Sequence, residues 1–226
     1  MTYDNICKGV FLSRPNRFIA HIEINGKKEI CHVKNTSRCT EILIPGADVY
    51  VNYVDNPNRT TMYDLISVYK GDMLINIDSQ APNRTFEEYL HKGKLFDNII
   101  AIKTEAKYGS SRFDFFVETA ESNVFIEVKG VSLEEEGIAM FPGAPTERGI
   151  KHLNQLAACV AAGYEAYVVF VIQMRGVKLL TPSYKIHEAF GHTLAKVMKM
   201  GVKAIAFDSL VKPDNIEIDK QVPVLL

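Results

Sequence analysis

The sequence predicts an α+β protein with a small antiparallel β-barrel over residues 1–80 and an α/β domain over residues 81–226. Three observations lead to this prediction. The chain has 226 residues, 47% of them hydrophobic, and can bury a core in one large or two small domains. The first 80 residues are short apolar runs separated by turn signals. After Ala81-Pro82, strand-like runs alternate with helix-like ones, the pattern typical of α/β units.

The expected barrel strands are short runs separated by turn residues such as Pro15-Asn16, Asn25-Gly26 and Pro45-Gly46. Asn25-Gly26 between two alternating runs is a strong hairpin signal. Five or six such strands in 80 residues favour a small barrel, with an OB-type barrel as one candidate. The runs are GVFLS, RFIAHIEI, EICHVK, ADVYVNYV, TMYDLISVY and MLINI.

The second domain is expected to combine three helices with five strands. Its clearest helix runs from Thr146, a suitable N-cap, to Ala162, and Gly163 ends it. The nearly continuous apolar run at 164–172 is typical of a strand buried on both faces. The other expected helices cover 86–95 and 186–200, and the other strands cover 99–104, 112–118, 123–129 and 202–207.

Composition excludes several classes of protein. No apolar run approaches the roughly 18 residues of a membrane helix, and the N-terminus lacks the apolar stretch of a secretory signal. Four scattered cysteines do not form a disulfide framework, so we expect a reduced, cytoplasmic protein without a membrane partner. The net charge is -1, yet the segment from Lys8 to Arg38 has seven basic residues against two acidic ones. This basic segment is a candidate surface for a polyanion.

The most informative stretch joins two expected strands, RFDFFVE and NVFIEVK, through a four-residue connection. If Glu118 pairs with Asn123, Asp114 lies opposite Glu127, about 5 Å away between Cβ atoms. Alternation then puts Asp114 on the face away from the neighbouring Phe113, Phe115 and Val117. Glu127 and Lys129 share one face of their own strand, so all three polar groups can lie together.

Two carboxylates placed so closely share a proton or bind a cation. Mg²⁺ and Mn²⁺ prefer such oxygen ligands, and Lys129 could stabilise negative charge on a scissile phosphate or orient a water. This is the set of groups needed for metal-assisted phosphodiester hydrolysis. A solvated sheet face with a Glu–Lys pair and an unrelated Asp would give the same pattern.

Longer motifs resemble the sugar fermentation stimulation protein A family over essentially the whole chain. They are RPNRF (14–18), HVKNTSR (32–38), IPGA (44–47), EAKYGSSRFDF (105–115), IEVKGVSL (126–133), FPGAPTERGIKHL (141–153) and VVFVIQM (168–174). The resemblance implies an N-terminal OB-like barrel and a C-terminal domain like the PD-(D/E)xK nucleases. It also implies nucleic-acid binding and a link to the regulation of maltose metabolism.

Carried onto this chain, the family motif D…ExK falls on Asp114, Glu127 and Lys129, and Glu105 matches an acidic position before Tyr-Gly. The resemblance therefore implies Asp114, Glu127 and Glu105 as ligands of Mg²⁺ or Mn²⁺, with Lys129 as a catalytic group. Two positions depart from the family pattern. Ser37 stands where the family usually has Gly, and Gly143 where it usually has Asp, which removes a carboxylate near the expected site.

Basic residues are the expected contacts to nucleic acid, since lysine and arginine neutralise phosphates. The first turn of the helix after Thr146 can also receive a phosphate through its free amides. An exposed aromatic side chain could stack on a base. The candidates are Arg14, Arg17, Lys34, Arg38 and Arg59 for phosphates, Phe18 for stacking, and Arg148 and Lys151 on the helix.

The expected function is a nucleic-acid-binding protein, DNA before RNA, with divalent-metal-dependent nuclease chemistry. A DNA-binding regulator of sugar metabolism genes, with a nuclease fold that does not cut, is the main alternative. An RNA-processing enzyme is a third. The sequence leaves open single or double strands, and a monomer or a homodimer.

Overall fold

The computed structural model describes residues 1–226, and its N-terminal strands close into a barrel. Five strands form the closed ring, in the order β3-β2-β1-β4-β5 with β5 pairing back to β3. β5 also pairs with β6, because its first residues meet β3 and its last residues meet β6. The strands are β1 (Ile6–Ser13), β2 (Ile19–Ile24), β3 (Lys27–Val33), β4 (Asp48–Tyr53), β5 (Tyr63–Lys70) and β6 (Met73–Asn76). All six expected runs are therefore strands.

The β2–β3 hairpin turns at Asn25-Gly26, as the sequence predicts. Ile24 pairs with Lys27, and both turn residues have positive φ, 51° and 75°. Such a two-residue turn needs φ > 0 at both positions, which Asn and Gly tolerate. The chain between β3 and β4 then covers one end of the barrel and buries Cys39, Ile42 and Leu43.

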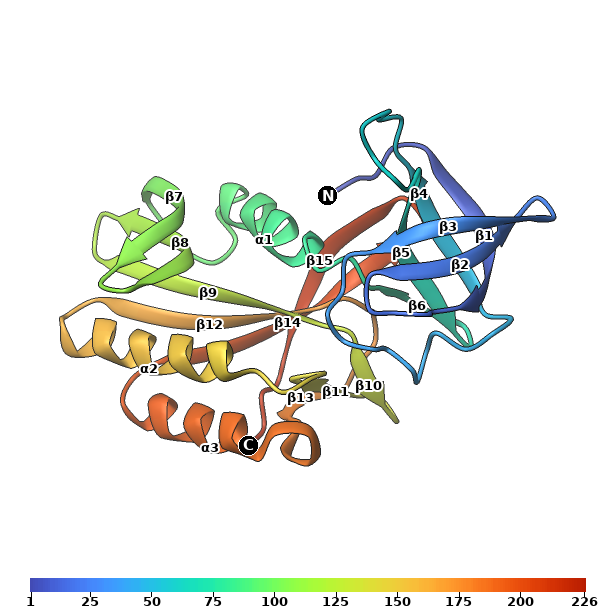
Figure 1. Cartoon of the computed structure of the whole chain (residues 1–226). Coiled ribbons are helices and arrows are strands. Elements are labelled where there is room, and N and C mark those ends of the chain that lie inside the picture. The colour runs from blue at the N-terminus through green and yellow to red at the C-terminus, as the bar shows by residue number, and fades with distance from the viewer.

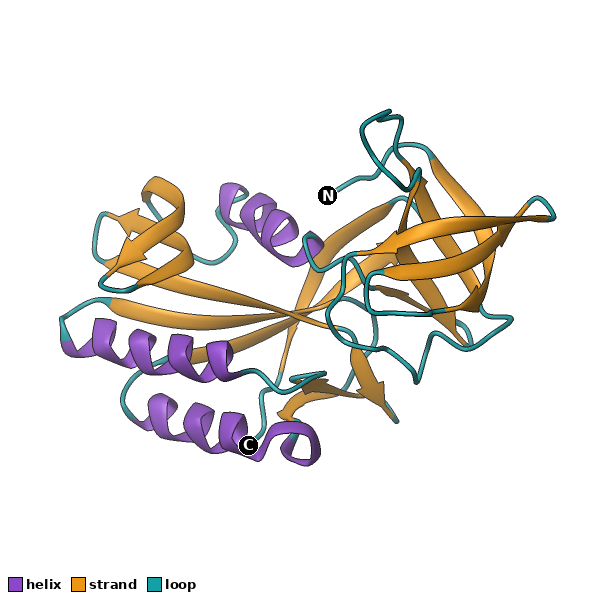
Figure 2. Cartoon of the chain, in the orientation of Figure 1, coloured by secondary structure: helices purple, strands orange, loops and turns teal.

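The second domain is a six-stranded mixed sheet with helices on both faces (Figures 1 and 2). Its strand order is β15-β14-β12-β9-β8-β7, and the central three strands are parallel. Helix α1 packs on one face, whereas α2 and α3 pack together on the other. The strands are β7 (Ile99–Tyr108), β8 (Ser111–Thr119), β9 (Asn123–Val131), β12 (Glu165–Ile172), β14 (Lys203–Lys212) and β15 (Asn215–Val222).

A small third sheet joins β10 (Leu133–Glu135), β11 (Ile138–Phe141) and β13 (Leu179–Pro182). These three strands and β15 were not expected from the sequence. β10, β11 and β13 have only three or four residues each, too few for alternation to be recognised. In the folded chain they hold the segment 132–146 beside the end of β9, because β11 pairs in parallel with β13.

Two of the three helices match their expected ranges within two residues. They are α2 (Glu147–Ala161) and α3 (Tyr184–Lys199), and the Thr146 side chain caps α2 by accepting from Gly149 N at 3.0 Å. The third expected range, 86–95, is wrong at both ends, since α1 covers Ala81–His91. Proline in the first turn of a helix costs no hydrogen bond, so the Ala81-Pro82 break is the start of α1. No helix is both long and apolar enough to cross a membrane.

Candidate metal and nucleic-acid site

The site forms where β8 and β9 separate. Their pairing has the expected register, from Glu118 opposite Asn123 to Phe115 opposite Ile126, and then ends. Beyond that point the Asp114 side chain replaces the partner strand. Its Oδ2 accepts the backbone N–H of Val128 at 2.7 Å, and its Oδ1 accepts from Asn83 Nδ2 of α1 at 2.8 Å. Asp114 is thus held between the end of the strand pair and the first turn of α1.

The expected alternation along β8 is wrong at Asp114. Phe113 packs in the core on the α2 side, with its ring 6.1 Å from that of His152. Phe115 packs on the α1 side, with its ring 5.6 Å from that of Phe86. Phe113 and Phe115 therefore face opposite sides, although they are two residues apart. The regular period of two fails because Asp114 takes a backbone donor of β9 and the backbone ladder ends there.

Glu127 lies on β9 with its side chain toward α2. It is only 4% exposed. Its Oε1 is bonded by Lys129 Nζ at 2.5 Å and by the imidazole Nδ1 of His152, whereas its Oε2 is buried without any partner. Buried carboxylate oxygens normally have partners, so this oxygen is free to accept a further ligand.

The two carboxylates have opposite electrostatic surroundings. Burial and the negative charge of Glu127 raise the pKa of Asp114 to about 6, although its hydrogen bonds oppose this rise. Burial alone would raise the pKa of Glu127 too, but the hydrogen bonds from His152 and Lys129 and the positive charge of Lys129 outweigh it and lower that pKa. Around neutral pH both groups are therefore ionised, and Asp114 is the one whose charge is costly.

His152 is a site residue to which the sequence assigned no role. It projects from α2, is 6% exposed, and accepts Arg148 Nε at its Nε2, 3.4 Å away. A guanidinium only donates, so Nε2 carries the lone pair and Nδ1 donates its proton to Glu127. The signal available in the sequence was a histidine beside Leu153 in the buried stripe of an amphipathic helix.

Glu105 does not join this group. Its side chain is 64% exposed and faces Arg112 at 3.5 Å, on a residue with φ of 53°. No group of three His, Cys, Asp or Glu side chains in the chain is arranged to hold a metal ion. The carboxylate pair of Asp114 and Glu127 is therefore the candidate metal site, and the role of Glu105 as a third ligand stays a prediction.

Arg14 has a structural environment that the sequence did not reveal. Its two terminal nitrogens donate to four backbone carbonyls, those of Arg17, Asn35, Ser37 and Arg38. All four terminal N–H groups are used, and burial lowers the pKa of the guanidinium. Arg14 thus shapes the loop that carries Arg38, and this placement argues against the expected contact between Arg14 and a phosphate.

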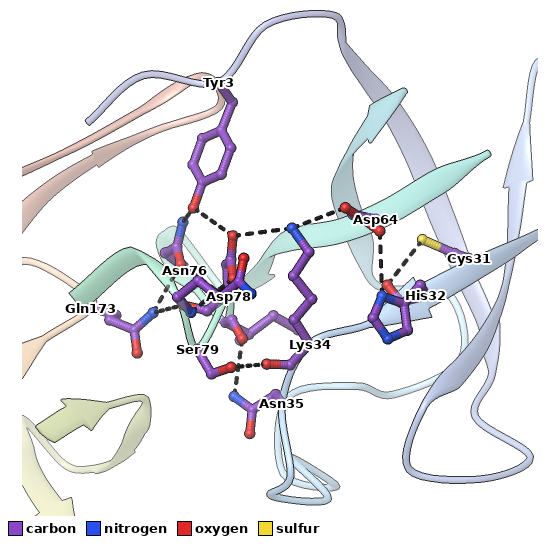
Figure 3. Close-up of polar contacts among 12 residues, drawn as sticks. Tyr3, Cys31, His32, Lys34, Asn35, Asp64, Asn76, Asp78, Ser79 and Gln173 are labelled. Carbon is purple, nitrogen blue, oxygen red and sulfur yellow. Dashed lines mark hydrogen bonds and ion pairs between the residues drawn. The ribbon is translucent and has the colours of Figure 1, made fainter. Parts of the chain in front are cut away.

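Lys34 and Arg59 are also bound within the barrel, and Figure 3 shows the contact of Lys34 with Asp64. Both pair with Asp64, a carboxylate only 2% exposed. Lys34 Nζ lies 2.9 Å from Oδ2, and Arg59 binds both oxygens. These hydrogen bonds outweigh burial and lower the pKa of Asp64. The two cations compensate a buried charge, so neither is a free phosphate contact in this structure.

Arg17, Phe18, Arg38, Arg148 and Lys151 remain exposed. Phe18 immediately precedes β2 and is 56% exposed, so its ring is open for stacking. Arg17 and Arg38 line a groove of about 910 Å³ between the barrel and the segment Gly143–Pro145. This groove is the candidate path for a phosphate backbone.

The two departures from the family pattern meet at this groove. A Cβ on Gly143 would lie 3.0 Å from Ser37 Oγ, so the barrel loop and the loop after β11 touch there. In this chain the serine side chain is at position 37 and the glycine is at position 143. The family usually has the glycine at position 37 and an aspartate at position 143.

Comparisons with known proteins agree with both halves of the fold. Residues 12–77 match the model of the SfsA N-terminal OB domain, and residues 80–215 match that of the sugar fermentation stimulation protein RE domain. A sugar fermentation stimulation protein homolog of Desulfitobacterium hafniense is 56% identical over 226 residues, which cover 100% of this chain and 99% of the relative. A homolog of Ruminiclostridium cellulolyticum is 54% identical over the full length of both chains.

A solved structure is also similar over the whole molecule. The structure of Pyrococcus furiosus SfsA, described as a complex with Ca²⁺, superposes with a TM-score of 0.90 at 26% identity. The superposition covers 100% of this chain and 98% of the Pyrococcus furiosus chain. The barrel and the restriction-endonuclease-like sheet thus occur together in that protein too. The chain belongs to the sugar fermentation stimulation protein (SfsA) family.

Proposed function

We propose that this protein binds nucleic acid, with DNA favoured over RNA, and hydrolyses phosphodiester bonds with the help of a divalent metal ion. One observation carries the proposal: the buried, unpartnered Oε2 of Glu127 in a site shared with the carboxylate of Asp114. A buried acceptor without a donor is costly unless a cation or a water completes it.

The residues present fit Mg²⁺ or Mn²⁺. Carboxylate oxygens are the ligands such hard cations prefer, and Asp114 and Glu127 would hold the ion. Burial raises the pKa of Asp114 most and repulsion from Glu127 adds to it, and a bound cation would offset that repulsion. The complex of the Pyrococcus furiosus relative with Ca²⁺, another hard cation, supports a divalent site. When bound, the ion supplies Lewis-acid activation of the phosphate and of a water.

The chain's own groups would orient the substrate and balance its charge. Lys129 is 15% exposed at its side chain and lies against Glu127, so its ammonium can stabilise negative charge that develops on a phosphate beside the carboxylates. His152 fixes the Glu127 carboxylate from the α2 side. Arg17 and Arg38 in the groove and Lys151 on α2 are exposed basic groups that can bind phosphates. Arg148, whose Nε donates to His152, can use its terminal nitrogens for the same purpose.

A second function has its own support. Lys129 and His152 both bind Oε1 of Glu127, and no third acidic side chain completes the carboxylate pair. These two side chains could hold the Glu127 carboxylate without a metal ion. Such a site suits a DNA-binding regulator of sugar metabolism genes that no longer cuts.

Cleavage assays separate the two functions. The protein is incubated with end-labelled single- and double-stranded DNA and RNA, with Mn²⁺, Mg²⁺ or chelator. The nuclease proposal expects cleavage that is lost with chelator and in Asp114→Ala, but retained in Asp55→Ala, a matched change at an exposed barrel position. Binding without cleavage of any substrate would favour the regulator. Cleavage confined to RNA would favour an RNA-processing enzyme.

A further inference from the structure

A second cavity lies one residue beyond Lys129, between the barrel and the small third sheet. It has a volume of about 230 Å³. None of its lining side chains is charged. Its wall contains both apolar groups and hydroxyl or amide groups. The lining residues include Asn35, Ser37, Ser132, Phe141, Thr146 and Gln173.

Gln173 directs an unpartnered acceptor into this cavity. The residue follows β12 and is 2% exposed. Its Nε2 donates to Asn76 Oδ1 at 2.9 Å and to Asp78 O at 3.0 Å, so both amide hydrogens are used and the amide orientation is fixed (Figure 3). No donor reaches Oε1. This oxygen lies beside Gly130, another wall residue, where a Cβ would come within 2.7 Å of it.

We propose that this cavity binds one unpaired nucleobase of the nucleic acid, an inference that rests on the proposed function. An uncharged lining suits neither a phosphate, which needs cations, nor a metal ion, which needs carboxylates. A nucleobase is neutral and flat, with donors and acceptors along its edge. Phe141 and Pro142 offer apolar surface for its faces, and Oε1 of Gln173 accepts an N–H from its edge.

The cavity lies between the basic groove and the end of β9 that carries Lys129. The cavity shares Ser37, Ser132 and the segment Gly143–Pro145 with the basic groove, so the two are adjacent. Its other end reaches Gly130, next to Lys129. A strand whose backbone follows the groove would thus place one base in the cavity, with the edge of that base toward Gly130. The substrate must then be single-stranded or unpaired at that nucleotide.

The test combines abasic substrates with a variant that fills the cavity. Binding of single-stranded oligonucleotides with one abasic site, moved along the strand, is measured by fluorescence anisotropy in chelator. We expect one position at which the missing base weakens binding about 5- to 150-fold, the range for one stacked base. Ala144→Leu, on the cavity wall, should weaken the intact strand similarly without further weakening that abasic strand. Ala120→Leu, at an exposed turn, is the matched control and should change nothing.

Saturation-transfer NMR of the wild-type protein with adenosine and with ribose separates the two proposals. Strong binding of intact strands with no effect of the abasic sites or of Ala144→Leu overturns the base pocket and leaves the proposed function intact. If no strand binds, the proposed function fails, and adenosine signals that Ala144→Leu abolishes would still support the pocket. If no strand binds and adenosine gives no saturation-transfer signal, or ribose binds as well as adenosine, the pocket proposal is overturned too.

Discussion

Asp114→Asn should make the protein more stable and abolish the proposed metal binding. Asparagine has the shape of aspartate and keeps one oxygen to accept the N–H of Val128. Its amide group can pair with Asn83, whose own amide can turn to present its oxygen. The substitution therefore removes mainly the buried negative charge.

The size of the gain follows from the pKa of Asp114, which burial and Glu127 raise to about 6. A carboxyl with a raised pKa holds its proton more tightly in the folded than in the unfolded chain. The free energy of unfolding therefore falls as pH rises through the window from about 4 to about 6. At 1.36 kcal/mol per pH unit, ionised Asp114 costs about 3 kcal/mol at pH 7 and nothing at pH 3. Asp114→Asn should regain up to that amount at neutral pH.

Urea unfolding at pH 3, 5 and 7 in chelator measures this gain, with Asp55→Asn as the exposed control. Saturating Mn²⁺ should then reverse the order of stability at pH 7. Only the wild type should gain, by about 4 kcal/mol at a thousandfold excess over Kd, which exceeds the surplus of Asp114→Asn. Two results in chelator would refute the electrostatic reasoning. One is equal free energies of unfolding for wild type and Asp114→Asn at pH 7, and the other is a surplus of Asp114→Asn that persists at pH 3.

Three further experiments, with five substitutions in all, test the site and the groove. Lys129→Met should lower the single-turnover cleavage rate about 10²–10³-fold with a much smaller effect on affinity; an unchanged rate would exclude the ammonium from the reaction. Arg17→Ala and Arg38→Ala should each flatten the log–log salt dependence of DNA binding by about 0.9, and an unchanged slope would place the interface elsewhere. Gly143→Asp should lower the free energy of unfolding, and Ser37→Gly in the same chain should restore part of the loss. The coupling between the two substitutions should be about 0.5–1 kcal/mol by urea unfolding, and additive effects would contradict their contact.

Most of the fold followed from local patterns. Strand alternation, the Asn25-Gly26 hairpin and the Thr146 cap are set by residues near one another in the chain, so their physical chemistry can be read locally. The register of β8 and β9 was predictable because a short turn joins them. The start of α1 was missed because a proline that ends one element can equally open a helix.

The functional site divides in the same way. The D…ExK pattern placed Asp114 and Glu127 near each other from the hairpin register and the family resemblance alone. Their partners, Asn83 and His152, come from helices that pack on the sheet only in the folded chain. The same holds for the basic residues. Charge alone cannot distinguish a cation free to meet a phosphate, such as Arg17, from one that compensates the buried Asp64, such as Arg59. That distinction depends on which carboxylates and carbonyls the tertiary fold brings within hydrogen-bonding distance.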